Sequence, residues 1–305
     1  MIRVSIPATS ANLGPGFDCI GMAFDMYNVI EVEETSQPGV KIEVVGEGAE
    51  TIPLDETNLV LVSMKAVFEQ VGYDFKGLKI TLYNDIPLTR GLGSSAACIA
   101  GGMMAANELS GSKLTLKQII NKAAQMDGHP DNVLPAIIGG LTVGCLYEDE
   151  VYYSRLDPPT KMDFIMLIPD FELETVKARS VLPTHVSISD AIFNISRAAL
   201  MIASMMTGNT ENLLVATDDR LHQPYRKKLI PNFEEILVAC KENGAKGVFL
   251  SGAGPTIIVM LDGGQEEFIA NMKEFLMKYD HDWLLKDCEV CHMGLSVERI
   301  NEREI

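Results

Sequence analysis

The sequence predicts an α+β protein that is divided into two lobes. With 305 residues, 47% of them hydrophobic, the chain exceeds the usual size of one domain and can bury a large core. Stretches with strand periodicity and stretches with helical spacing alternate without an internal repeat. The run Asp157-Pro158-Pro159-Thr160 interrupts both patterns, because proline fixes φ and removes a backbone donor. We therefore expect one lobe over residues 1–158 and a second over residues 159–305.

The first lobe combines a half-exposed sheet with helices. Apolar runs and period-two alternation predict strands over residues 2–6, 28–34, 40–45, 78–87, 135–147 and 151–156. Apolar residues near helical spacing predict a helix over 57–72. A further helix is expected to run from an N-cap at Thr115 through Met126, because a threonine oxygen can accept from the free amides of the first turn.

The second lobe shows the same mixture. Strands are predicted over 163–170 and over two short apolar runs, 248–250 and 256–261, which flank a glycine turn. Two helices are predicted, one capped by Ser189 and one over 266–279. Their apolar residues at helical spacing are Ile192, Ile195, Ala199 and Ile202 in the first, and Phe268, Ile269, Met272, Phe275 and Leu276 in the second.

The composition argues against several protein classes. The 25 Lys and Arg residues against 42 Asp and Glu give a net charge of −17, which repels a polyphosphate backbone, and no basic stripe offsets it. No window reaches the roughly 18 apolar residues of a membrane-spanning helix, and the N-terminus lacks the apolar segment of a signal peptide. Six cysteines lie scattered among hydrophobic neighbours, as free thiols in a reducing cytosol do. We expect a cytoplasmic protein with no nucleic-acid or membrane partner.

A glycine-serine loop precedes a run of small residues, in the stretch IPLTRGLGSSAACIAGG (86–102). Gly91 and Gly93 permit positive φ, so that backbone amides can converge on one point. Ser94 and Ser95 then begin a helix whose first amides have no internal partner and suit a phosphate. We expect a side chain at Gly93 to block that phosphate. No lysine follows as in a Walker A loop, and a plain strand-to-helix turn with capping serines is the alternative.

The stretch CEVCH, Cys288 to His292, satisfies a haem-attachment pattern and could also suggest a zinc or redox site. No export signal and no second C-x-x-C motif accompany it. The surrounding EVCHMGLSVE alternates like a strand, so we interpret both cysteines as residues in or near the core.

The stretch PLTRGLGSSAA, Pro87 to Ala97, resembles the ATP-binding signature of the GHMP kinases, the family of galacto-, homoserine, mevalonate and phosphomevalonate kinases. PATSANLGPGFDCIG (7–21) and GVFLSGAGPTIIV (247–259) resemble two further motifs of that family, in the family's order. The resemblance implies a ribosomal-protein-S5-like N-terminal lobe, a ferredoxin-like C-terminal lobe and a site between them. It also implies an ATP site formed by Pro87, Leu88, Thr89, Arg90, Gly91, Leu92, Gly93, Ser94, Ser95, Ala96, Ala97, Gly252 and Gly254.

Within the family, TSANLGPGFD together with GHPDNVLPAIIGG (128–140) is most similar to the members that phosphorylate homoserine. The resemblance therefore implies transfer of a phosphoryl group from ATP to the side-chain hydroxyl of L-homoserine, a step toward threonine. The implied amino-acid site consists of Asn12, Asp18, His129, Asp131, Thr175, Arg179 and Arg226.

These residue types fit a zwitterion that carries a hydroxyl. Arg179 and Arg226 can act as carboxylate clamps, because a guanidinium presents paired donors; surface ion pairing is the alternative for both. Asp18 and Asp131 are candidate acceptors of the hydroxyl proton, or else capping residues of turns. His129 is expected to contact the substrate rather than to act as a base. Phosphoryl transfer depends mainly on positioning and charge, so we expect no strong base to be required.

Magnesium is expected to bridge the phosphates, as a hard cation with oxygen ligands. Ser94 or Ser95 is the predicted protein oxygen. Many members of the family add a glutamate from the helix before the GHPDN block. The stretch 119–128 contains none here, so Asp127 is the one carboxylate available.

Two alternatives stay open at the level of the sequence. The chain could be another GHMP kinase, acting on a sugar or on a mevalonate-type acid. It could also be a catalytically inactive ATP-binding regulator with the same fold. A homodimer is compatible with either.

Overall fold

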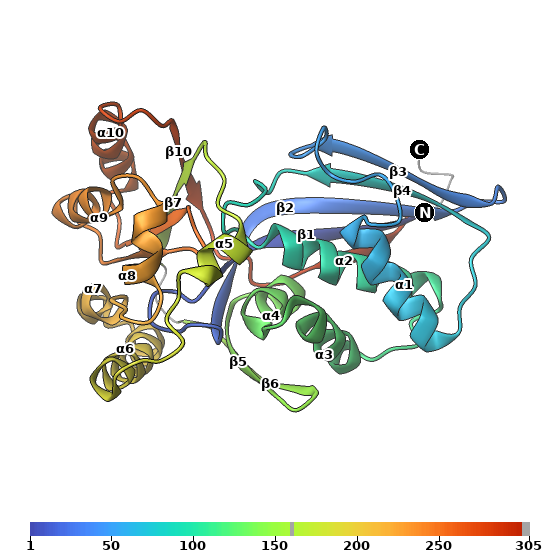
Figure 1. Ribbon diagram of the computed structural model, residues 1–305, viewed down its shortest axis with the longest axis horizontal. Helices are drawn as coiled ribbons and strands as arrows, with labels where there is room; N and C mark the ends of the chain where they lie inside the picture. The colour runs from blue at the N-terminus through green and yellow to red at the C-terminus, as the bar shows by residue number, and fades with distance from the viewer. Residues whose placement is uncertain (159–161, 301–305) are drawn as a thin grey trace.

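The computed structural model describes residues 1–158 and 162–300, which form two sheets with helices packed against them (Figure 1). The first sheet's sixth strand ends at Leu156 and the second sheet begins at Asp163. Pro159 and Thr160 of the predicted boundary lie outside the described residues, so the boundary itself stays a prediction.

The first sheet is built around one long strand, β2. Its members are β1 (Ile2–Ala11), β2 (Ile20–Glu34), β3 (Gly39–Gly46), β4 (Gly77–Asn84), β5 (Leu141–Tyr147), β6 (Glu150–Leu156) and β11 (Ser296–Arg299). Their order is β11-β1-β2-β4-β3, and β5 pairs with both β2 and β6. The second half of β2 pairs with β4 and its first three residues pair with β5. Strand β11 comes from the C-terminal end of the chain, so residues 296–299 belong to this sheet and not to the predicted second lobe.

Four helices cover one face of the first sheet (Figure 1). They are α1 (Leu59–Val71), α2 (Ser94–Leu109), α3 (Leu116–Asp127) and α4 (Pro130–Ile138). Helix α3 begins as the sequence predicts, because Thr115 accepts from the Gln118 amide and Gln118 in turn accepts from the Thr115 amide. Small residues on α2 allow close packing: a Cβ at Gly102 would lie 2.6 Å from the Val60 carbonyl oxygen of α1.

The second sheet has the ferredoxin-like order. Its strands are β7 (Asp163–Pro169), β8 (Gly247–Leu250), β9 (Ile257–Leu261) and β10 (Trp283–Cys288), arranged as β10-β7-β9-β8 with every neighbour antiparallel. In chain order this is the fourth, first, third and second strand of a β-α-β-β-α-β unit. The helices are α5 (Thr175–Ser180), α6 (Ile188–Thr207), α7 (Leu213–Ala216), α8 (Gln223–Arg226), α9 (Phe233–Glu242) and α10 (Gln265–Leu276), with short 3₁₀ turns at Thr210–Asn212 and Lys227–Leu229.

Strand β7 is buried on both faces and joins the two halves of the molecule. Ile165 and Leu167 point to one core, which α9 and α10 close with Ile236 and Phe268. Phe164, Met166 and Ile168 belong to the other core, which is continuous with that of the first sheet. The Phe164 ring meets Phe24 of β2 edge to face at 5.3 Å. One apolar core therefore spans both sheets and holds them together as a continuous scaffold.

The prediction of a strand over 135–147 is wrong in its first half. Residues 130–138 form helix α4, and the strand begins only at Leu141. Pro130 at the start and Asp131 in the first turn are favourable helix-start residues. A short buried apolar run cannot be assigned to strand or helix by periodicity, which explains the error.

Helix α6 begins two residues earlier and faces the other way. Its N-cap is Ser187 rather than Ser189, and the Ser187 Oγ accepts from the Asp190 amide at 3.1 Å. Ile192 and Ile195 are exposed, while Asn194, Met201 and Met205 are buried. Of the helices in the described chain, α6 alone is long and apolar enough to cross a membrane; a single such helix is weak evidence, because core helices pass the same test.

The strand predicted across EVCHMGLSVE is wrong except for its last three residues, 296–298. Strand β10 ends at Cys288, Val290 forms an isolated bridge with Phe24, and β11 begins only at Ser296. Cys288 and Cys291 are both buried and free, as expected for core residues.

Candidate active site

A cavity of about 580 Å³ lies between the two halves of the molecule. Its walls come from the loop before α2, the N-termini of α1, α2 and α4, the end of α3, helices α5 and α8, and the turns after β1 and β8. All seven predicted amino-acid-site residues line it: Asn12, Asp18, His129, Asp131, Thr175, Arg179 and Arg226. Of the predicted ATP-site residues, the ten from Pro87 to Ala96 and Gly252 line it, whereas Ala97 and Gly254 do not.

The glycine-serine loop leaves a run of backbone amides free. Gly93 has a left-handed conformation and is the N-cap of α2. Within residues 1–158 and 162–300, no protein acceptor pairs with the amides of Leu92 through Ala96. The amides of Ser94, Ser95 and Ala96 open the helix, where the macrodipole adds partial positive charge. Such an array is suited to a polyphosphate.

The loop is held from behind by two distant parts of the chain. The Leu92 carbonyl accepts from the Thr9 amide at 3.0 Å, and the Gly91 carbonyl accepts from the Ser251 Oγ at 2.6 Å. A Cβ on Gly91 would overlap the Ser251 carbonyl oxygen. Glycine at 91 is therefore needed for the close approach of the turn after β8. Gly254 packs against Leu250, away from the cavity.

The expected reason for glycine at position 93 is wrong. A Cβ at Gly93 would overlap the Oγ1 of Thr9 on β1 instead of entering the cavity. A larger residue there would disturb the joint between α2 and β1. Arg90 also differs from a simple phosphate ligand, because its guanidinium donates to the carbonyls of Leu88, Pro169 and Asp170 and so ties the loop to the end of β7.

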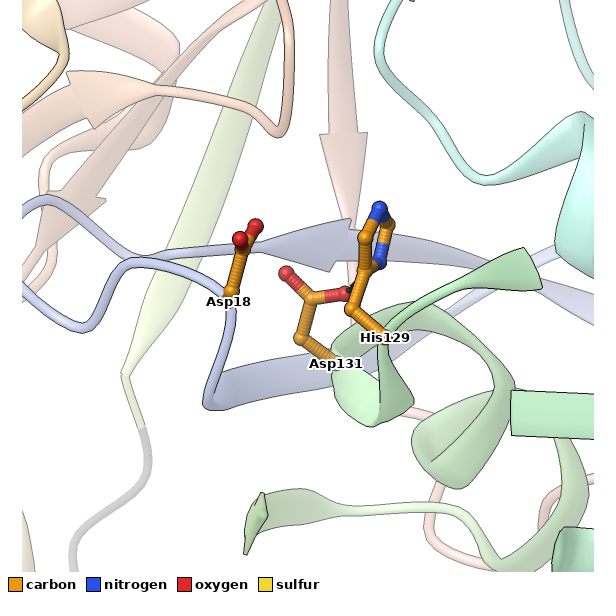
Figure 2. Close-up of side chains that lie close together, drawn as sticks. All are labelled: Asp18, His129 and Asp131. Atoms are coloured by element: carbon orange, nitrogen blue, oxygen red, sulfur yellow. Dashed lines mark hydrogen bonds and ion pairs between the residues drawn. The ribbon is translucent and has the colours of Figure 1, made fainter. Parts of the chain in front are cut away.

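Asp18, His129 and Asp131 lie together at the floor of the cavity, with ligand atoms within 4.8 Å of one another (Figure 2). His129 is the N-cap of α4, and Asp131 lies in its first turn. The His129 Nδ1 is 2.7 Å from the Asp131 Oδ1. Burial disfavours the charged imidazole, but the hydrogen bond and charge of Asp131, together with Asp127, raise the pKa of His129 to about 9. A protonated His129 can donate a hydrogen bond and cannot act as a base at neutral pH.

The stability of the metal-free protein is expected to fall between about pH 6.5 and pH 9. His129 has a folded-state pKa of about 9 against an ordinary value of 6.5. Between these two pH values the folded state holds a proton on His129 that the unfolded chain has released. The resulting stabilisation of the folded state is complete below pH 6.5 and is lost as the pH rises through 9. Urea unfolding in the presence of a chelator measures this. His129→Gln should flatten the profile in this window; an unchanged slope would contradict the assignment.

Arg179 and Arg226 line the same cavity as Asp18, His129 and Asp131. Arg179 forms a paired ion bridge with Asp18, with Nη1–Oδ2 at 3.2 Å and Nη2–Oδ1 at 2.9 Å. Its side chain is 45% exposed. Asn12 fixes this region, since its Oδ1 accepts from the Asp18 amide and its Nδ2 donates to the Gly252 carbonyl. Thr175 lies at the exposed start of α5, at the cavity rim.

Arg226 is buried, with only 2% of its surface exposed. Its Nε donates to the Ala178 carbonyl at 3.3 Å, and its Nη1 donates to the Gly252 carbonyl at 2.8 Å. Burial and the nearby Arg179 charge lower its pKa to about 10, which still leaves it charged at neutral pH. In the part of the chain that the structure describes, its Nη2 has no acceptor. That nitrogen is available to an anionic ligand in the cavity.

The donor set fits a magnesium ion. The Ser94 Oγ is buried and has no hydrogen-bond partner among the described residues, an arrangement that a cation would satisfy. Asp127 lines the same cavity with a carboxylate whose pKa burial raises to about 6. Ser95 is exposed and less suited. Serine and carboxylate oxygens are the ligand types that magnesium prefers.

Ser94→Ala is expected to have opposite effects on the free protein and on its complex. Removing a buried hydroxyl without a partner should leave the unfolding temperature unchanged or raise it, because the desolvation cost of about 1–3 kcal/mol disappears. The same change should weaken MgATP binding about ten-fold while ATP in chelator is little affected. Calorimetry and thermal unfolding measure both; loss of stability together with unaltered MgATP affinity would contradict this role.

Some residues of the site are not predicted by the sequence analysis. One end of the cavity is mainly apolar and is lined by residues including Ile52, Pro53, Leu59, Val60, Cys98, Ile99 and Met126. Asn58 shapes this end by capping α1, with its Oδ1 accepting from the Val60 amide at 3.0 Å. An asparagine just before an apolar helix is a recognisable N-cap signal. Its place beside the phosphate loop depends on tertiary packing.

Comparison with known proteins agrees with this geometry. The pattern of the GHMP kinases N terminal domain matches residues 58–140, and that of the GHMP kinases C terminal domain matches residues 196–276. The chain is 51% identical to a homoserine kinase of Petrotoga mobilis over 297 residues, covering 97% of this chain and 96% of that protein. It is 52% identical to a homoserine kinase of Caldicellulosiruptor bescii over 299 residues, covering 97% of each.

Solved structures show the same similarity. A homoserine kinase from Cytophaga hutchinsonii superposes with a TM-score of 0.89 at 28% identity, over 97% of each chain. A mevalonate kinase of L. major, crystallised with R-mevalonate, reaches a TM-score of 0.71 at 14% identity, covering 93% of this chain and 94% of that one. At that identity the second match supports the fold alone.

Proposed function

This chain belongs to the GHMP kinase family, and from that premise we propose that it phosphorylates the side-chain hydroxyl of L-homoserine with ATP. The observation that carries the proposal is a single cavity with three kinds of wall. The apolar end suits a nucleoside base, and the free amides at the start of α2 suit a triphosphate. The part of the lining that contains Arg226 suits an amino acid.

The Arg179–Asp18 ion pair offers a place for a zwitterion. An ammonium group can pair with Asp18 while a carboxylate pairs with Arg179 and with the Nη2 of buried Arg226. When the ligand separates Arg179 from Asp18, each of these two side chains therefore still has an oppositely charged partner. A sugar would leave both arginines unused, and a mevalonate-type acid has no ammonium group for Asp18. This charge pattern favours homoserine over the alternative family substrates.

Phosphoryl transfer from this arrangement depends on position and charge. The amides of the α2 start hold the phosphates, and the aspartates at the start of α4 and in the loop after β1 face the hydroxyl. Asp131 is the better candidate for the proton acceptor, because Asp18 pairs with the ammonium group in this arrangement, while the Oδ2 of Asp131 has no partner among the described residues. Charged His129 holds Asp131 in place through its 2.7 Å contact. Little covalent assistance is required for a loose transition state.

We also propose that Ser94 and Asp127 hold magnesium, which neutralises phosphate charge when it is bound. The partnerless Ser94 Oγ supports this part of the proposal. A cytosolic location, the absence of nucleic-acid and membrane partners, and a homodimer stay predictions; the six free cysteines support a reducing compartment.

A substrate panel tests the proposed function. L-homoserine, L-serine, L-threonine, mevalonate and galactose are offered separately with MgATP, and both ADP and the phosphorylated product are measured. We expect L-homoserine to give the highest kcat/KM, with O-phospho-L-homoserine as the product. Preference for mevalonate or a sugar would identify another family activity. ATP binding without turnover of any hydroxyl substrate would indicate an inactive regulator.

A further inference from the structure

A buried polar network lies behind Arg226, outside the cavity lining. Its members, His222, Asp219 and Asn194, are each at most 3% exposed. None of them touches the space where substrate would bind, and the proposed reaction gives them no role. Burying a polar group costs free energy unless the group is hydrogen-bonded, so such a network indicates that these side chains hold a particular local structure in place.

The contacts of His222 assign its tautomer. Its Nε2 lies 2.7 Å from the Gly14 carbonyl oxygen, which can only accept, so Nε2 carries the proton. Its Nδ1 lies 3.1 Å from the Nη1 of Arg226, which can only donate, so Nδ1 presents a lone pair. Burial, assisted by the Arg226 charge, lowers the pKa of His222 to about 4 and keeps the ring neutral. A doubly protonated ring would oppose the guanidinium.

Asp219 fixes the backbone that carries His222. Its carboxylate accepts from three consecutive amides, Leu221 at 2.8 Å, His222 at 3.0 Å and Gln223 at 2.6 Å. It also accepts from the Asn194 Nδ2 at 2.7 Å, and that same nitrogen donates to the Pro15 carbonyl at 3.1 Å. The start of α8 is therefore tied both to α6 and to the loop after β1.

Phe17 joins the same loop to both arginines. Its ring stacks on His222 at 5.2 Å with an interplanar angle of 26°. The guanidinium carbons of Arg179 and Arg226 lie 5.5 and 5.4 Å from its centroid. The loop that ends in Asp18 and the side chain of Arg226 thus share two supports, the Phe17 ring and the His222 imidazole.

We propose that His222 is a positioning residue for the substrate carboxylate. It holds the Arg226 guanidinium so that Nε and Nη1 are engaged by protein acceptors and Nη2 faces the cavity, and it fixes the Gly14–Asp18 loop against that arginine. The proposal rests on the proposed function, since the carboxylate is that of homoserine. A positioning role predicts that changes at His222 affect ligands with a carboxylate and spare ligands without one.

Binding of two ligands that are not phosphorylated in this experiment tests whether His222 affects carboxylate binding in particular. L-2-aminobutyrate keeps the ammonium and carboxylate and lacks the hydroxyl, whereas 3-amino-1-propanol keeps the ammonium and hydroxyl and lacks the carboxylate. Their dissociation constants are measured by calorimetry in the presence of ADP, for wild type, His222→Gln and His222→Asn. Glutamine can place a donor near Nε2 but offers no acceptor to Arg226, while asparagine can place an acceptor near Nδ1. Exposed His292→Gln is the matched control.

We expect His222→Gln to weaken L-2-aminobutyrate roughly ten-fold and 3-amino-1-propanol less than two-fold, because a hydrogen bond to a charged group is lost. His222→Asn should weaken L-2-aminobutyrate less than His222→Gln does. Equal losses for both ligands, or no difference between the two variants, would overturn the proposal while leaving homoserine phosphorylation by the wild type intact. A wild type that binds no L-2-aminobutyrate would overturn the proposed function as well.

Nitrogen NMR of the wild-type histidines gives a second readout if the variants fold poorly. For the His222 ring we expect a neutral state protonated at Nε2 at pH 7, with an Nδ1 signal that shifts on adding L-2-aminobutyrate and not on adding 3-amino-1-propanol. A charged His222 ring, or a proton on its Nδ1, would overturn the assignment.

Discussion

Replacing Arg226 with methionine is expected to raise the KM for L-homoserine about 100-fold while the KM for ATP changes less than about three-fold. The guanidinium is almost fully buried, so its pairing with a carboxylate is weakly screened by water. A hydrogen bond to a charged group contributes about 1.5–3 kcal/mol, and more is lost when the partner charge stays buried without compensation. Methionine keeps the length and most of the apolar volume of the side chain.

Arg179→Met is the matched comparison. This side chain is 45% exposed and already pairs with Asp18, so its loss is expected to raise the KM for homoserine only about three- to ten-fold. Initial rates over a homoserine concentration series, with the protein's folding checked by circular dichroism, measure both variants. An Arg226 variant with a KM near that of the wild type, or a larger effect at Arg179, would remove Arg226 as the main carboxylate ligand.

Replacing Asp131 with asparagine is expected to lower kcat by about 100-fold or more while ATP still binds. Asp131 is 1% exposed, and only its Oδ1 is engaged, by His129 and Asn132. Among the described residues, no partner pairs with Oδ2, which is therefore free to accept the hydroxyl proton. General acid–base groups typically contribute factors of about 10² to 10⁴.

Asp18→Asn tests which of the two carboxylates, Asp18 or Asp131, accepts the hydroxyl proton. Because Asp18 is paired with Arg179 and faces the expected ammonium position, its loss should act mainly on the KM for homoserine. Single-turnover measurements with saturating ATP and homoserine distinguish the chemical step from binding. A kcat loss at Asp18 that exceeds the loss at Asp131 would transfer the proton-acceptor role to Asp18.

Local features of the site could be predicted from the sequence. The amides after Gly91 are free because a glycine-rich turn leads directly into a helix, and both features are visible in GLGSSAA. The capping of α3 by Thr115 depends on residues three positions apart. In both cases the decisive contacts lie within a few residues along the chain.

Features that depend on distant segments could not be predicted in the same way. The contact that excludes a side chain at Gly93 comes from Thr9, and the acceptors of Arg226 come from Ala178 and Gly252. The role of His222 becomes visible only when Gly14 and Arg226 are seen on opposite sides of its ring. The hydrophobic pattern also led to a wrong prediction for α4, because a short apolar run cannot be assigned to a buried helix or a buried strand by its periodicity.

A crystal structure with L-homoserine, magnesium and a non-hydrolysable ATP analogue would test the central claim most directly. We expect the triphosphate within hydrogen-bond distance of the Leu92–Ala96 amides, the homoserine carboxylate on Arg226, and the hydroxyl between the terminal phosphate and Asp131. A triphosphate bound away from the start of α2, or a homoserine carboxylate that contacts neither Arg226 nor Arg179, would contradict the account.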